Sequence, residues 1–326
     1  MPKRPALNRW RDCRHQMTLL YYDPIFMEHQ TGDHPESPRR LLPIVRHLHF
    51  LGLDVACRRP SWEPASREQL ALVHTPEYID QVEQFAASGG GWLDPDTRLS
   101  HRSYEVACLA SGAACDAASR LAVGEDKTAF CLLRPPGHHA TEDQAMGFCL
   151  FNHVAVAARH AIKSRGMNRV LIVDFDVHHG NGTQDIFYGD PAVAYFSMHR
   201  DNFYPHTGAA LETGTGAAVG TTKNLPITMG TSREEQRALF DRELTAFADH
   251  FQPDLIIASA GFDSHVDDPV GSLGLHTEDF AAIAKTLLRV ATDHSDGRLL
   301  SVLEGGYNPE ALSDSITLYL ETLLEA

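Results

Sequence analysis

A run of four β-favouring apolar residues, 170–173, leads directly into side chains that a protein core would not ordinarily accept. In an extended chain alternate side chains share one face, so Asp174, Asp176 and His178 are expected to point the same way. Two carboxylates held that close repel each other unless a proton or a cation neutralises them. Aspartate combined with histidine is a ligand set that suits zinc. The segment therefore predicts a metal site at the end of a buried strand, in preference to a strand end that is merely solvated.

Strand-like and helix-like segments alternate along the rest of the chain. Strands are expected at 18–22, 128–133, 170–173, 193–198, 254–259 and 299–303. Helices are expected at 39–51, 75–87, 104–123, 152–164, 232–250, 277–292 and 309–324. Such alternation implies the α/β class, with a parallel sheet that helices cover on both faces. We expect one domain over residues 17–326, preceded by a flexible basic tail at 1–16.

Composition argues against several classes of protein. The formal net charge of -15 disfavours a nucleic-acid partner and would attract cationic substrates. The apolar runs are too short to cross a bilayer, so no membrane partner is expected. The six cysteines form no CxxC pair, which favours reduced thiols and a cytoplasmic location. The sequence is compatible with a homo-oligomer but does not indicate how many subunits it would have.

Four of the expected strands run directly into polar or glycine-rich segments. These are RPPGHHA at 134–140, DFDVHHGNG at 174–182, AGFDSH at 260–265 and EGGYN at 304–308. In a doubly wound parallel sheet, ligands bind at the carboxyl ends of the strands. Four segments that are far apart in the sequence should therefore converge on one place.

The side chains of these segments are suited to hydrolytic chemistry. Asp176, His178 and Asp263 would provide three ligands to one metal, which leaves a position open for water or substrate. On its own, Asp263 would equally well cap a helix. The adjacent His138 and His139 would transfer protons, because histidine titrates near neutral pH.

Three further side chains could assist. Asp174, which the metal does not need, could orient one of the imidazoles. Tyr307 follows two glycines and could donate a hydrogen bond to a developing oxyanion. Phe148, which follows Gly147, could line a channel for an alkyl chain. Packing in the core is the ordinary alternative for both aromatic rings.

Taken together, the motifs resemble those of the zinc-dependent histone deacetylase family, within the arginase-deacetylase superfamily. RPPGHHA, GFCLFN, DFDVHHGNGT, AGFDSH followed by DDP, and EGGYN occur in this order between residues 18 and 324. Asn181 and the LDPDT segment at 93–97 look like the second class of the family, which includes bacterial histone deacetylase-like amidohydrolases. The resemblance implies a three-layer α/β/α fold with a mainly parallel sheet of about eight strands.

The resemblance also implies roles for the residues that match these motifs. Asp176, His178 and Asp263 would bind zinc, and Tyr307 would polarise the substrate carbonyl. His139 would act as general base, and His138, backed by Asp174, as its electrostatic or acid partner. His139 would be paired with Asn181, where the first class of the family has aspartate. An amide gives no charge stabilisation to an imidazolium, so His139 should titrate lower than it would beside aspartate.

A substrate channel and a second cation follow from the same resemblance. Phe148, Gly147 and Tyr204 would form the channel walls, where phenylalanine is usual in place of Tyr204. Asp94 matches a rim aspartate that holds the substrate backbone, and Val270 lies in the turn near the channel mouth. A potassium ion near the zinc would be bound by the side chains of Asp174 and Ser197. The backbone carbonyls of Asp176, His178 and Met198 would complete its site.

The activity implied is hydrolysis of an N-acyl amide, with acetyl-lysine in a protein or peptide as the substrate. Acetylpolyamine hydrolysis is the alternative, and a small acetylated amine would then be the substrate. Polyamine-selective relatives place an acidic residue where this chain has Val270, which favours acyl-lysine.

An arginase-like ureohydrolase would need a second metal cluster. A zinc-binding interaction module without catalysis would be expected to lack His138, His139 or Tyr307. Iron(II) is an alternative to zinc in an Asp-His-Asp site.

Overall fold

A parallel sheet forms the centre of the computed structural model, which describes residues 18–326. Its strands are β1 (Leu19–Tyr21), β4 (Thr128–Cys131), β5 (Val170–Asp174), β6 (Val193–Arg200), β7 (Thr222–Ile227), β8 (Leu255–Ala260) and β9 (Leu299–Leu303). Their order across the sheet is β1-β4-β9-β8-β5-β6-β7, and every neighbouring pair is parallel. The tail expected at 1–16, and Met17, lie outside the described residues.

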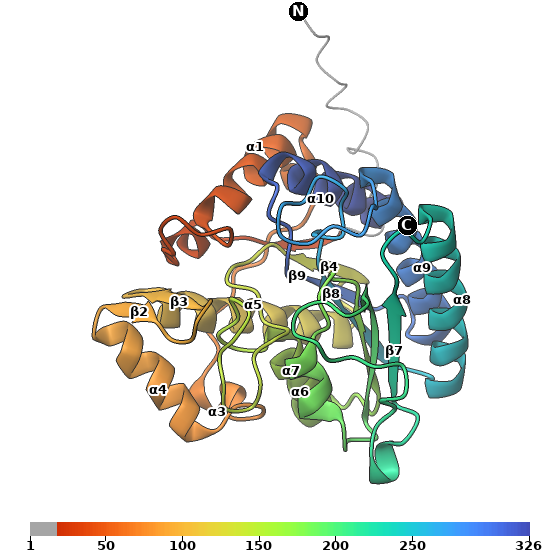
Figure 1. Cartoon of the computed structure of the whole chain (residues 1–326), viewed down its shortest axis with the longest axis horizontal. Helices are drawn as coiled ribbons and strands as arrows, with labels where there is room; N and C mark the ends of the chain where they lie inside the picture. The colour runs from red at the N-terminus through yellow and green to blue at the C-terminus, as the bar shows by residue number, and fades with distance from the viewer. Residues whose placement is uncertain (1–17) are drawn as a thin grey trace, which may run out of the picture.

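Helices cover both faces of the sheet (Figure 1). One layer contains α5 (Ser103–Ala122) and α6 (His153–Arg165), which pack against each other. The other layer contains α8 (Arg233–Phe251), α9 (Thr277–His294), α10 (Pro309–Leu324) and, against α10, α1 (Leu41–Leu51). Every residue of β4, β5, β8 and β9 is buried, as expected for strands covered on both sides. The three-layer α/β/α architecture is confirmed.

Shorter elements connect these layers. They are η1 (Pro24–Glu28), η2 (Pro38–Arg40), α2 (Leu53–Ala56), α3 (Arg67–Leu70), α4 (Pro76–Ala87), β2 (Gly90–Trp92), β3 (Arg98–Ser100), α7 (Asn181–Phe187) and η3 (Gly216–Ala218). The small β2–β3 pair is antiparallel and separate from the main sheet. None of the helices in residues 18–326 combines the length and the apolar character that a membrane span requires.

Local signals in the sequence account for where several helices begin. Thr75 accepts a hydrogen bond from the backbone N–H of Tyr78 at the start of α4, and Pro76 occupies the first helical position. Ser232 accepts one from the N–H of Glu235 at the start of α8. Asn308 caps α10, which begins with Pro309. Each of these starts matches the expected boundary.

Three features of the fold differ from expectation. The main sheet of the described chain has seven strands, where the family resemblance implied eight. Its edge strand β7 has no counterpart among the expected strands, because Lys223 and Pro226 interrupt the apolar alternation that identifies a strand. Proline is tolerated there because only an edge strand leaves one side of its backbone without a ladder partner. The β2–β3 pair likewise has no counterpart among the expected strands.

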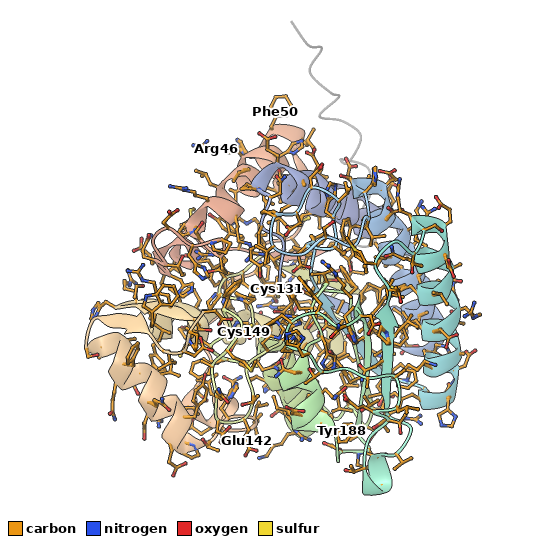
Figure 2. The ribbon with its side chains drawn as sticks, in the orientation of Figure 1. Arg46, Phe50, Cys131, Glu142, Cys149 and Tyr188 are labelled. Atoms are coloured by element: carbon orange, nitrogen blue, oxygen red, sulfur yellow. The ribbon has the colours of Figure 1, made fainter. Side chains whose placement is uncertain are left out.

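The register of the sheet brings the expected segments together. Asp174 at the end of β5 pairs with Ser259 of β8, and Ser259 pairs with Val302 of β9. The carboxyl ends of these strands are therefore level, and the segments that follow them meet above the same edge. Side chains fill the interior beneath, where Cys131 and Cys149 lie, whereas Phe50 projects from α1 into solvent (Figure 2).

Candidate metal centre and active site

Asp176, His178 and Asp263 form a buried cluster at the carboxyl ends of β5 and β8. Their ligand atoms all lie within 4.8 Å of one another. The Nδ1 atom of His178 lies 2.9 Å from Asp176 Oδ1 and 3.1 Å from Asp263 Oδ2. Three potential ligand atoms therefore point at one place, as a metal ion would require.

The electrostatics of this cluster favour a cation. Burial alone would lower the pKa of His178, but the two carboxylates outweigh it and raise that pKa to about 10. Burial and the charge of Asp176 raise the pKa of Asp263 to about 7. Asp263 Oδ2 lies 3.1 Å from His178 Nδ1, but it is not aligned for a hydrogen bond with that atom or with any other described residue. A divalent metal ion fits this site, because its side chains bind protons strongly and one carboxylate oxygen has no hydrogen bond.

Gly305 lets the backbone pass directly beneath the cluster. A Cβ atom at this position would lie 2.2 Å from Asp263 Oδ2 and 2.5 Å from Asp176 Oδ2, closer than real Cβ contacts allow. The N–H of Gly305 donates instead to Asp176 Oδ2 at 2.8 Å. The first glycine of the EGGYN segment is thus explained by its close approach to the two acidic side chains.

His138 and His139 lie beside the cluster with their rings 4.0 Å apart. His138 Nδ1 lies 3.0 Å from Asp174 Oδ2, and His139 Nδ1 lies 2.9 Å from Asn181 Oδ1. An amide oxygen only accepts, so His139 Nδ1 donates and its Nε2 atom is left free to accept a proton. Both of the pairings expected from the sequence are therefore present.

The two histidines differ in protonation. Burial would lower the pKa of His138, but Asp174 and Asp176 raise it to about 10. Burial, together with the positive charge on His138, lowers the pKa of His139 well below its usual range. One imidazole therefore carries a proton near neutral pH, while its neighbour is free to take one.

Tyr307 approaches the cluster from the end of β9. Burial raises the pKa of its phenol well above the usual value, so the hydroxyl remains a donor. The guanidinium of Arg40 lies 4.8 Å from the centre of the Tyr307 ring, and Phe148 meets the ring edge-on at 5.7 Å. The Tyr307 side chain is thus packed between a cation and an aromatic ring.

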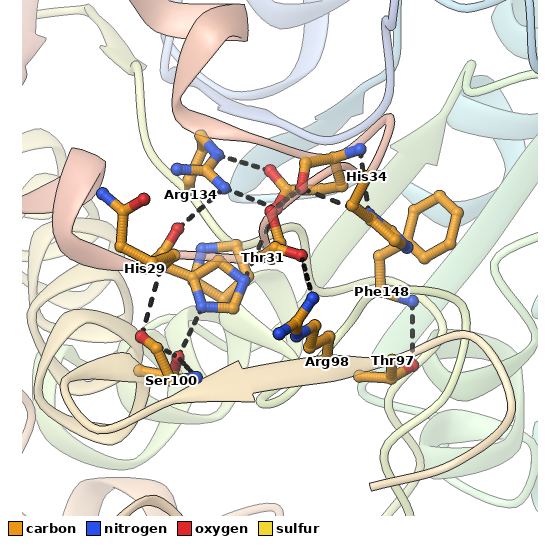
Figure 3. Close-up of polar contacts among 12 residues, drawn as sticks. His29, Thr31, His34, Thr97, Arg98, Ser100, Arg134 and Phe148 are labelled. Carbon is orange, nitrogen blue, oxygen red and sulfur yellow. Dashed lines mark hydrogen bonds and ion pairs between the residues drawn. The ribbon is translucent and has the colours of Figure 1, made fainter. Parts of the chain in front are cut away.

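The residues expected to line a channel lie beside His139 and Tyr307. Tyr204 meets the ring of His139 edge-on at 5.2 Å, and Phe148 adopts a left-handed backbone with φ of 70°. The N–H group of Gly147 donates to Asp96 Oδ1 at 3.0 Å. The N–H group of Phe148 donates to Thr97 Oγ1, also at 3.0 Å (Figure 3). The segment at 93–97, which we call the rim loop, therefore fixes one wall of the expected channel.

Asp94 and Val270 occupy turns near the channel. Asp94 Oδ1 accepts the N–H groups of Asp96 and Thr97, so that carboxylate oxygen is used within its own turn. Val270 is partly buried, and its N–H donates to Asp268 Oδ1 at 2.9 Å.

Of the residues expected at the potassium site, Asp174 and Ser197 are paired in the sheet register. Ser197 Oγ lies 2.8 Å from His199 Nδ1.

Sequence reasoning missed a buried network of charged residues behind the site. Glu36 faces Arg134 at 2.5 Å and Arg40 at 3.1 Å, and all three side chains are at most 1% exposed. Arg134 also donates to the backbone carbonyls of Phe26 and His29 (Figure 3). Arg134 belongs to the RPPGHHA segment, but its partners come from a loop about one hundred residues earlier, so no local pattern identifies them.

Arg40 and Glu304 connect this network to the catalytic segments. Arg40 donates to the carbonyls of Glu304 at 2.5 Å and Gly306 at 2.6 Å. The carboxylate of Glu304 accepts the backbone N–H groups of Gly137 at 2.6 Å and His138 at 3.2 Å. The segments that carry the histidines and Tyr307 are therefore tied to each other as well as to the sheet.

The fold and this cluster together define an α/β protein with a candidate metal centre at the strand ends, and the comparisons with known proteins agree. A model of the histone deacetylase domain matches residues 34–323. The chain is 36% identical to "Histone deacetylase 14, chloroplastic" of Arabidopsis thaliana, covering 99% of this chain and 79% of that protein. It is 38% identical to human "Polyamine deacetylase HDAC10", covering 94% of this chain and 48% of that protein.

A solved structure gives the same result. The crystal structure of the HDA15 HD domain superposes with a TM-score of 0.88 at 36% identity, covering 95% of this chain and 88% of that one. The chain belongs to the histone deacetylase family.

Proposed function

We propose that the chain is a metal-dependent hydrolase that removes acetyl groups from the side-chain amine of lysine. The observation that carries this proposal is a pair of adjacent histidines, one paired with a carboxylate and the other with an amide, beside an Asp-His-Asp cluster. His138 has the carboxylate of Asp174 to balance its positive charge, whereas His139 has only the neutral amide of Asn181. Amide hydrolysis needs one group that takes a proton from water and a second that stabilises the charge that develops.

Zinc is the metal that we propose for Asp176, His178 and Asp263, on the strength of the family and of the donor set. When bound, it would polarise the acyl carbonyl and lower the pKa of water. We further propose that Asp174, Ser197 and the carbonyls of Asp176, His178 and Met198 hold a potassium ion. The pairing of Asp174 with Ser197 across β5 and β6 supports this second site.

Each remaining residue has one task in the proposed reaction. His139 accepts a proton from the attacking water through its free Nε2 atom and returns it to the amine as the amide C–N bond breaks. His138 stays protonated and stabilises negative charge near the reacting carbonyl. Tyr307 donates a hydrogen bond to the carbonyl oxygen as charge builds on it. Phe148 and Tyr204 hold the alkyl chain between their rings and exclude water.

Acetylpolyamine hydrolysis is the second candidate, and one relative carries that name. Two carboxylates, Asp94 and Asp96, lie in the rim loop and would attract a cationic amine. Val270 favours acetyl-lysine, because an apolar side chain cannot pair with a secondary ammonium group.

We also propose that residues 17–326 act as one catalytic domain. A cytoplasmic location is supported by five free, buried cysteines among the described residues.

The test is a side-by-side assay of zinc-reconstituted protein on an acetyl-lysine peptide and on N-acetylspermidine, with Tyr307→Phe as the control. We expect turnover of the peptide to be lost on chelation and to fall by about 10²–10³-fold in the variant, as when an oxyanion donor is removed. A higher kcat/KM for N-acetylspermidine would replace the lysine proposal with the polyamine one. Turnover that survives chelation would remove the metal from the mechanism.

A further inference from the structure

Asp268 occupies an unusual position in the loop that follows β8. It comes five residues after the candidate metal ligand Asp263 and is only 8% exposed. Its Oδ1 atom accepts the backbone N–H groups of Val270 and Gly271, both at 2.9 Å. Its Oδ2 atom accepts those of Tyr307 at 2.6 Å and Asn308 at 3.3 Å. One carboxylate therefore joins the turn that carries Val270 to the segment that carries Tyr307.

Among the described residues, the hydrogen-bond donors to the Asp268 carboxylate are all backbone N–H groups. No ion pair joins Asp268 to a cationic side chain in the part of the chain that the structure describes. Hydrogen bonds from N–H groups to a charged acceptor are roughly twice as strong as those between neutral groups. Removing the charge would therefore weaken all of these contacts at once.

Tyr307 needs an anchor of this kind because of its neighbours in the chain. Gly306 precedes it with φ of 121°, a conformation that glycine adopts at little cost and that restrains the chain weakly. Asn308 follows it and begins α10 as the capping residue. The side chain of Asn308 also donates to the carbonyl of Asp267 at 3.0 Å. The peptide group between Gly306 and Tyr307 is thus held at both ends, with Asp268 of the 267–271 turn accepting its N–H and Arg40 donating to its carbonyl.

We propose that Asp268 is a positioning residue for the deacetylation reaction and acts through Tyr307. It holds the Tyr307 backbone so that the phenol reaches the substrate carbonyl, and it ties that placement to the turn at the channel mouth. This inference rests on the proposed function of Tyr307. It assigns Asp268 no contact with substrate.

A double-mutant cycle on the zinc-loaded full chain tests the inference, using Asp268→Asn, Tyr307→Phe and the combination of both. Asparagine keeps one acceptor oxygen but presents an NH₂ group to the other pair of N–H donors. We expect kcat to fall by about 10–100-fold in Asp268→Asn, since small displacements of a reacting group have effects of this size, and KM to change by less than about threefold. In the Tyr307→Phe background the same change should lower kcat by less than about twofold, because the interaction that it disturbs is already gone.

Asp267→Asn is the matched control. The side chain of Asp267 is 70% exposed and lies 3.9 Å from His265 Nδ1, so its loss should leave kcat within about twofold of the parent value. If Asp268→Asn does not fold, as judged by thermal melting, Asp268→Glu replaces it, because glutamate keeps the charge and displaces the oxygens.

Two outcomes would overturn the inference while the proposed function stands. One is an equal loss of kcat with and without the Tyr307 hydroxyl, which would mean general damage to the site. The other is an unchanged kcat in Asp268→Asn. A wild-type protein that turns over neither acetylated substrate would overturn the proposed function, and the role of Asp268 with it.

Discussion

Two clusters of charged side chains are almost completely buried in this molecule, and they differ in how their charge is balanced. In the first, Glu36 contacts both Arg40 and Arg134, and further donors of the two arginines bind backbone carbonyls. In the second, Asp176 and Asp263 converge on a single imidazole, and Asp263 Oδ2 has no hydrogen-bond partner among the described residues.

The difference separates structural charge from functional charge. A cluster that the protein completes with its own groups holds segments together and needs no ligand. A cluster that is left short of positive charge is unfavourable until a cation arrives, and so forms a binding site. Burial alone does not distinguish the two, because both are nearly inaccessible to solvent.

The comparison is tested most strongly by Asp263→Asn. Removing this ligand should abolish zinc binding and lower deacetylation by more than about 10³-fold, since the chemistry depends on the metal. The chelated protein should be as stable as the wild type or more so, because the pKa of Asp263 is raised to about 7 by burial and by Asp176. Metal content after dialysis against zinc, and melting of the chelated forms, measure the two effects. A chelated variant that melts several degrees below the wild type would show that the cluster is structural.

Glu36→Gln should have the opposite effect and lower the stability of the protein. It leaves two buried guanidinium groups without their carboxylate, which typically costs about 3–5 kcal/mol in the free energy of unfolding. The control is Glu105→Gln, because Glu105 pairs with Arg102 on the surface with its side chain 52% exposed, and such pairs contribute less than about 1 kcal/mol. Urea unfolding of the three proteins gives the comparison. Equal effects of the two substitutions would remove the distinction drawn for the first cluster.

A buried histidine outside both clusters should give the smallest effect. His153 Nε2 lies 3.1 Å from the carbonyl of Pro135, and its Nδ1 lies 2.8 Å from Ser111 Oγ, so both ring nitrogens have neutral partners. Burial lowers the pKa of His153 to about 4. The unfolded chain, with a histidine pKa of about 6.5, binds a proton more readily between these values. Stability contributed by neutral His153 is therefore complete above about pH 6.5 and is lost as the pH falls towards 4.

Between pH 7 and pH 5 this single group should reduce the free energy of unfolding by about 2 kcal/mol. The measurement is urea unfolding at both pH values for the wild type and for His153→Asn, whose pH dependence should be smaller by that amount. The same pH dependence in both proteins would show that His153 is not kept neutral by the fold.

The parts of the fold that follow from local signals could be predicted from the sequence. The strand at 299–303 and the helix at 309–324 have the expected boundaries, because each is delimited by glycine, asparagine or proline. The metal cluster could also be anticipated, because its segments follow strands of one parallel sheet, and the pairings of the two histidines were implied by the resemblance to the family. The edge strand β7 was missed because its residues carry little of the alternation that identifies a strand.

The residues that support the site could not be anticipated in this way. Arg40 reaches Gly306 across 266 positions, and Arg134 reaches Glu36 across 98. Neither pair produces a periodic pattern in the sequence. A charged side chain in a loop is normally exposed, so nothing marks these residues as buried. Asp268 and Glu304 likewise bind backbone N–H groups, which every segment of a chain provides and which therefore mark no particular partner.

The position of β9 has a consequence for how the protein is made. β9 is the last of the sheet strands in the chain, yet it lies between β4 and β8 in the middle of the sheet. A ribosome adds residues in order, so the two flanking strands emerge before the strand that separates them. Until residues 299–307 have been synthesised, the nascent chain lacks both the strand that joins β4 to β8 and Tyr307. Activity should therefore appear only when this insertion is complete, and fragments that end before β9 should have no partial activity.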